Sequence, residues 1–158
     1  MTKESLRLDE DSTLSAERAS QLFPDPASDA AVLNCLREHN FDMQTTAKAL
    51  GWDRSTVTQR LKGLCFQALV EAKGDQAKAA LAIAGDPSYL RTAELKLRDY
   101  YGHLQAVIES FPTAEEAMID CRRRFKNLPE RHFKSVEMLV RRHFEQKRPV
   151  HSESAPHL

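Results

Sequence analysis

The spacing of apolar residues predicts an all-α protein. From Ser28 or Asp29 onward, either of which can N-cap a helix, apolar side chains recur at steps of three and four. This spacing is typical of helices that turn one face to a core. No segment shows the alternation of a strand, so we expect helices throughout.

The first ordered segment should hold three short helices. The first starts at residue 29, and Asn40-Phe41-Asp42 breaks it. A second helix runs from Met43 to Leu50 and is ended by Gly51, which can adopt a positive φ. Asp53 can cap a third helix, from Arg54 to about Leu64.

The same pattern then recurs. A helix over 66–73, a break at Gly74-Asp75 and a helix over 76–84 precede Gly85, which lies 34 residues after Gly51. That period also fits tetratricopeptide repeats, but their W-x2-L-G-x2-Y pattern is missing and each unit here has three helices. We therefore favour two tandem three-helix units.

A long helix should start at Pro87 and carry a heptad-like apolar stripe. The stripe consists of Leu90, Ala93, Leu97, Tyr101, Leu104, Ile108 and Phe111. It is compatible with core packing in the same chain and with an oligomer contact. Pro112 ends this helix, Thr113 with Glu116 forms a capping box for the next, and Pro129 starts the last helix.

These patterns divide the chain into five segments. They are a flexible acidic segment (1–27), a helix-turn-helix (28–65), a second such unit ending in the long helix (66–111), a basic helical hairpin (112–148) and a disordered tail (149–158). Net charge is zero, but residues 1–30 carry three basic and seven acidic side chains, against 20 and 16 in the remainder. Arg122–Lys126 and Arg141–Arg148 are locally basic, which fits either an anionic partner or a solvated helix face.

The sequence gives no support for an enzyme, a metal site or a membrane span. Cys35, Cys65 and Cys121 are widely spaced and form no CxxC pair, so we expect reduced thiols. No paired carboxylates or nucleophile–base arrangement stands out, so we expect neither catalysis nor a cofactor. No apolar run approaches a membrane span or a signal peptide, which makes the cytoplasm the expected compartment.

The residues most suited to binding a partner lie at the start of the third helix. Two short helices joined by a turn with Gly form a helix-turn-helix, whose second helix lies in the DNA major groove with its first residues toward the bases. Here that helix start is crowded with hydrogen-bonding side chains, while Trp52 is expected to pack in the core. The candidate DNA-binding residues are Asp53, Arg54, Ser55, Thr56, Thr58, Gln59, Arg60 and Lys62.

The stretch ALGWDRSTVTQRLKGL resembles the Fis-type helix-turn-helix at the C-terminus of NtrC-class bacterial enhancer-binding regulators. The resemblance covers residues 29–64. It implies that Arg54 reads a base, that Thr56 holds a phosphate, and that Arg60 and Lys62 support backbone contacts. The sequence departs from the family pattern at Trp52, at Asp53 and at Phe41, which stands where Gly is usual.

The resemblance also implies a double-stranded DNA partner with an inverted-repeat site, a nucleoid-associated location and a homodimer. We expect dimer contacts through the helix of Leu90–Phe111 or the C-terminal helices. The second unit, with Glu94 at the place of Arg60, is expected to be a degenerate copy. No GxxxxGK[ST] loop is present, so the chain either stands alone or is a fragment of a regulator with an ATPase or receiver module. The rival hypothesis is a helical protein-interaction or dimerisation module of a larger regulator that does not read DNA.

Overall fold

A computed structural model describes residues 28–154 of the chain as all-α, as predicted. This part contains seven α-helices, one 3₁₀ turn and no strand. The elements are α2 (Asp29–Glu38), α3 (Met43–Leu50), α4 (Arg54–Glu71), α5 (Gln76–Ala84), η1 (Pro87–Tyr89), α6 (Leu90–Glu109), α7 (Ala114–Arg124) and α8 (Glu130–Ser154). The expectations for residues 1–27 and 155–158 lie outside the described residues.

Side-chain caps position the first three helices. Ser28 accepts a hydrogen bond from the Ala31 N–H and caps α2, while Asp42 and Asp53 cap α3 and α4 in the same way. Gly51 ends α3 with φ 74°. These ends agree with the sequence prediction, because each is encoded by a local capping residue.

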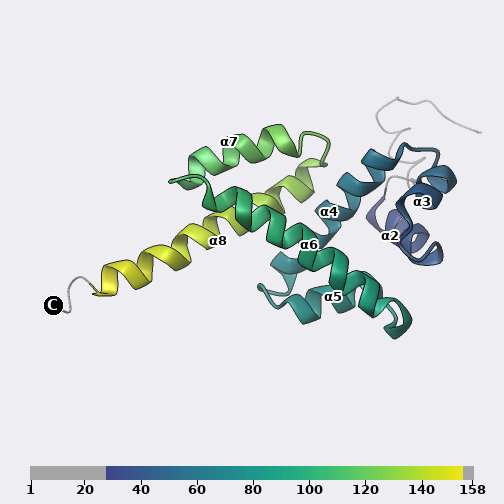
Figure 1. Cartoon of the computed structure of the whole chain (residues 1–158), viewed down its shortest axis with the longest axis horizontal. Helices are drawn as coiled ribbons and strands as arrows, with labels where there is room; N and C mark the ends of the chain where they lie inside the picture. The colour runs from purple at the N-terminus through teal and green to yellow at the C-terminus, as the bar shows by residue number, and fades with distance from the viewer. Residues whose placement is uncertain (1–27, 155–158) are drawn as a thin grey trace, which may run out of the picture.

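Helix α4 is longer than expected. The predicted end near Leu64 and the separate helix over 66–73 are wrong, since α4 continues unbroken to Glu71. Its middle turns, including Leu64, Cys65 and Phe66, are buried, because α4 lies at the centre of the molecule with neighbours around it (Figure 1). Tertiary packing thus carries the helix through the expected break.

The turn after α4 repeats the turn after α2. The N–H of Phe41 donates to the Leu36 carbonyl at 2.7 Å, and the N–H of Gly74 donates to the Leu69 carbonyl at 2.8 Å. Both turns have two consecutive residues with positive φ, Asn40-Phe41 and Lys73-Gly74, before an aspartate cap. Helix α4 therefore serves as the third helix of the first unit and the first helix of the second.

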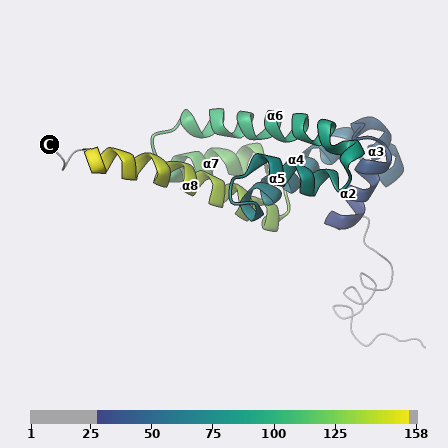
Figure 2. The same ribbon diagram turned by 90° about the horizontal axis from the view of Figure 1, so that it is seen from below.

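The long helix begins differently from the prediction. Asp86 accepts from the Ser88 N–H and holds a 3₁₀ turn, so the α-helix starts only at Leu90. Ala93, Leu97, Leu104 and Ile108, the centre of the heptad-like stripe, are at most 1% exposed. Figure 2 shows α6 running along one side of the other helices. The stripe is therefore used for core packing within the chain.

The hairpin of α7 and α8 is tied to both units. Asp29 at the start of α2 accepts hydrogen bonds from Arg131 at 2.7 Å and from the buried His132 at 3.1 Å. At the other end of α4, Arg142 donates to the Lys73 carbonyl at 2.8 Å. The hairpin thus holds the helices in place by contacts far apart in the sequence.

Helix α8 continues to Ser154, whereas a disordered tail was expected from Pro149. That expectation is wrong for residues 149–154, because a proline removes one intrahelical hydrogen bond without preventing the next turn from forming. The C-terminal end of α8 projects beyond α6 and α7 (Figures 1 and 2). None of the helices in residues 28–154 combines the length and the apolar character that a membrane crossing requires.

Candidate nucleic-acid interface

The first turn of α4 presents polar groups on a fixed frame. Asp53 accepts hydrogen bonds from the Thr56 N–H at 2.9 Å and from the Ser55 hydroxyl at 3.2 Å. The bonds from Thr56 and Ser55 lower the pKa of the Asp53 carboxyl below its ordinary value, so it stays ionised. Arg54 and Ser55 are exposed beside this cap.

The start of α3 lies beside the start of α4. Hydrogen bonds from Thr45 lower the pKa of the Asp42 carboxyl below its ordinary value. The charge of Arg54 lowers this pKa further. Gln44 and Thr45 are exposed next to Asp42 and so belong to the same surface. Sequence reasoning missed them because it treated α3 only as a support. Their polarity at the N-terminus of the positioning helix was the available signal.

The remaining candidates in the next turn are partly buried. Thr56, Thr58, Gln59 and Arg60 all have intermediate exposure. The Arg60 guanidinium lies 5.1 Å from the centroid of the Trp52 ring, a cation–π contact. Trp52 itself packs partly buried against the core, as predicted.

Lys62 is set apart from this cluster. Its Nζ atom lies 5.6 Å from the ring centroid of Tyr100 on α6 and 5.9 Å from that of Phe125 at the end of α7. Burial lowers the pKa of Lys62 below its ordinary value. The structure thus brings Lys62 to the hairpin rather than to Arg54, and its contact with DNA stays a prediction.

The second unit presents no comparable surface. Its third element starts with the 3₁₀ turn of Pro87–Tyr89, where Asp86 bonds both the N–H and the hydroxyl of Ser88. Glu94 is exposed on α6, so that face adds a negative charge. Arg91 and Arg98 are exposed on the same helix, so the charge of this surface is mixed.

Other kinds of chemistry find no support in the described residues. Within residues 28–154, no three His, Cys, Asp or Glu side chains are grouped so that they could hold a metal ion. Burial raises the pKa of Cys65 to about 12 and that of Cys121 to about 11, which leaves both thiols protonated and poorly nucleophilic. The capped start of α4 holds most of the residues that the sequence singled out as candidates.

Comparison with known proteins agrees with this geometry. No curated protein and no solved structure gave a significant match to the chain. A family model does match, over the segment that contains α2, α3 and the first turns of α4. Residues 30–64 of the chain match the model described as bacterial regulatory protein, Fis family, so the molecule carries a Fis-type helix-turn-helix, which suggests DNA binding in a bacterial regulator.

Proposed function

We propose that the protein is a sequence-specific double-stranded DNA-binding transcription regulator of the bacterial cytoplasm. The observation that carries this proposal is the exposed, aspartate-capped first turn of α4, with Arg54 and Ser55 at its surface, inside the Fis-family match. A helix in this setting places its N-terminal residues against base edges in the major groove.

Each exposed group has a role that fits its chemistry. The Arg54 guanidinium can donate two hydrogen bonds to guanine O6 and N7. Thr56 and the free N–H groups of the helix N-terminus can hold a phosphate, with Ser55 as a further donor. Asp53 belongs to the interface through its hydrogen bonds, which hold Ser55 and Thr56 in place. In the next turn, Thr58, Gln59 and Arg60 would contact the DNA backbone beside the bases that Arg54 reads.

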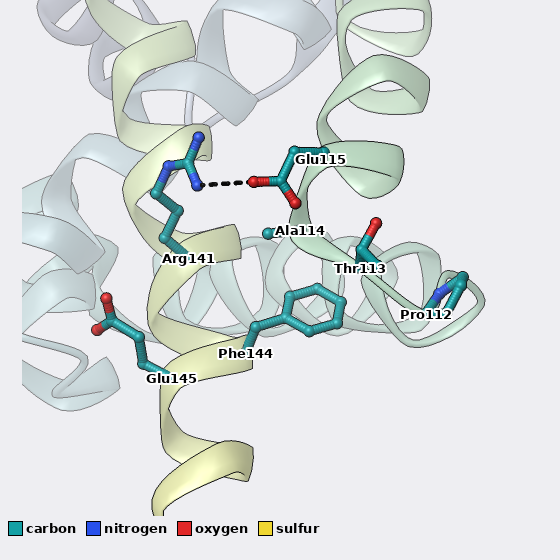
Figure 3. Close-up of a pocket in the computed structure, with 7 residues that line it drawn as sticks. All are labelled: Pro112, Thr113, Ala114, Glu115, Arg141, Phe144 and Glu145. Carbon is teal, nitrogen blue, oxygen red and sulfur yellow. Dashed lines mark ion pairs between the residues drawn. The ribbon is translucent and has the colours of Figure 1, made fainter.

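We further propose that the protein binds an inverted repeat as a homodimer, through the C-terminal helices α7 and α8. The stripe of α6 is buried in the chain and cannot serve this purpose. On α8, the Met138 side chain is 56% exposed, and Phe144 is half-buried at the edge of a 320 Å³ pocket. Figure 3 shows Phe144 beside Thr113, with Pro112 beyond it and the paired Arg141 and Glu115 above it in this view.

The proposal is tested by selection of duplexes from a random pool, and then by titration of the chain at physiological salt. We expect one enriched inverted repeat, bound far more tightly than unrelated duplex, because specific sites exceed non-specific DNA by about 10³–10⁷-fold. Light scattering should give a dimer on the selected duplex. Failure to enrich any sequence would contradict the proposal.

The rival function, a helical protein-interaction module, is favoured by one observation. The pocket beside Phe144 lies between α8 and the start of α7, and the exposed Met138 lies on α8 near Val70 and Lys73, at the opposite end of α4 from its first turn. If the chain fails to bind duplex DNA while light scattering still shows self-association, the hairpin rather than α4 carries the function.

A further inference from the structure

The basic turn between α7 and α8 lies against the recognition helix. The ring of Phe125 packs edge-on against Phe66 of α4, with centroids 5.7 Å apart, and it also covers the ammonium of Lys62. These contacts place the turn against the middle of α4. The segment Arg122–Lys126 is therefore fixed in position relative to the residues proposed to read DNA.

Helix geometry relates the turn to the first turn of α4. Lys62 comes seven residues after Ser55, so the two side chains lie on nearly the same face of the helix, about 10 Å apart along its axis. The DNA major groove is about 12 Å wide. A group that covers Lys62 is thus placed where a phosphate backbone runs once the helix start enters the groove.

Charge in the turn exceeds what its own carboxylates neutralise. Asp120 alone accepts from both Arg123 and Arg124, each at 2.5 Å, and Arg122 pairs with Glu130 at 3.1 Å. Lys126 is exposed and adds another positive charge. Arg122, Arg123 and Arg124 also suit the C-terminus of α7, whose dipole favours cations. That explanation does not extend to Lys126, which lies beyond the C-cap Phe125.

We propose that this basic turn, Arg122–Lys126, grips the phosphate backbone of duplex DNA beside the recognition helix, with Lys126 and Arg123 as the contacting cations. The inference rests on the proposed function of α4. It assigns to the hairpin the sequence-independent part of the affinity. Phosphate contacts of this kind fix the register of a protein on DNA without reading bases.

The test compares two lysines in turns that meet α4 at different points: Lys126 follows Phe125, which packs on Lys62 and Phe66, and Lys73 lies in the turn after the C-terminal end of α4. Lys126→Gln and Arg123→Gln/Lys126→Gln alter the basic turn, and Lys73→Gln makes the same change in the turn after the far end of the helix. Helix α4 has 18 residues and is about 27 Å long, so Lys73 is out of reach of DNA held at Arg54. Thermal melting checks that each variant is folded.

Affinity for the selected duplex and for a random duplex is then measured between 50 and 200 mM salt. Each lost phosphate contact should reduce the slope of log K against log salt by about 0.9, which is about a 3.5-fold smaller loss over this range. We expect Lys126→Gln to weaken both duplexes equally and the double variant to weaken them further. Lys73→Gln should match the wild type.

Two outcomes overturn the proposal in distinguishable ways. If both turn variants keep the wild-type slope while Arg54→Ala loses sequence preference, the turn does not touch DNA and the proposed function stands. In that case the basic turn would be assigned to binding an acidic protein partner instead of DNA. If the wild-type chain binds no duplex at 50 mM salt, the proposed function fails and the assignment of the turn fails with it.

Discussion

The two three-helix units share a type of turn but differ in their third helical element. In both, a positive-φ pair, an aspartate cap and a short helix ended by a left-handed glycine set the backbone course. After Gly51 the chain enters an α-helix with Arg54 and Ser55 exposed, whereas after Gly85 it enters a 3₁₀ turn and a helix packed along the core. The difference teaches that one backbone motif can lead into two different third elements, and we propose that only the first turn of α4 reads DNA.

The two turns differ at the second positive-φ position, which is Phe41 in the first turn and Gly74 in the second. This difference gives the largest predicted effect. Phe41 has φ 62° and is only 3% exposed, with its ring 6.3 Å from that of Tyr89 in the second unit. Replacing Phe41 by Ala removes this packing and should cost about 3–5 kcal/mol of unfolding free energy, measured by urea titration. A loss below about 1 kcal/mol would show that the ring does not join the units.

The next effect concerns the contact that holds α4 against α8. A Cβ atom at Gly63 would clash with Nδ1 of the fully buried His132, so Gly63→Ala should cost about 1–3 kcal/mol by overpacking. Gly102 on α6 has open space around it, and Gly102→Ala should stabilise the fold by about 0.5–1 kcal/mol. Equal melting temperatures for the two variants would contradict the close approach of α4 and α8.

Gly74 makes the comparison of the turns more direct. It has φ 87°, and an added Cβ would lie 3.1 Å from the Arg142 guanidinium, whereas Gly51 has φ 74° and open space. Gly74→Ala should cost about 1–2 kcal/mol from the left-handed backbone, and more than Gly51→Ala because of Arg142. The reverse order in chemical denaturation would mean that Arg142 does not hold the second turn.

The smallest effect is a pH dependence that comes from His132 of α8, which bonds Asp29 at the start of α2. Burial lowers the pKa of His132 below 6.5, although Asp29 opposes the shift. The unfolded chain therefore takes up the proton first, and this part of the stability is present above pH 6.5 and is lost as pH falls below it. Unfolding free energy at pH 7.5 and 5.5 should differ less in His132→Gln than in the wild type. An unchanged difference would exclude His132 as its source.

Local signals predicted much of this structure, and long-range packing accounts for the errors. Caps such as Ser28 and Asp53 and the glycine stops act within a few residues, so the ends of α2, α3 and α5 could be predicted. The unbroken α4 could not, because its continuation depends on neighbours supplied by other helices. For the same reason the contacts of Lys62 with Tyr100 and Phe125 were invisible in the sequence.

The central claim is that the first turn of α4, and not the second unit, reads DNA. Its most direct test is the affinity of Arg54→Ala and Arg91→Ala for the selected duplex and for a random one, with folding checked by thermal melts. Both arginines are exposed near the start of a third helix. Arg54→Ala should lose about 1–3 kcal/mol of discrimination between the duplexes, while Arg91→Ala keeps it. Equal losses on both duplexes for Arg54→Ala, or a loss of discrimination in Arg91→Ala, would contradict the account.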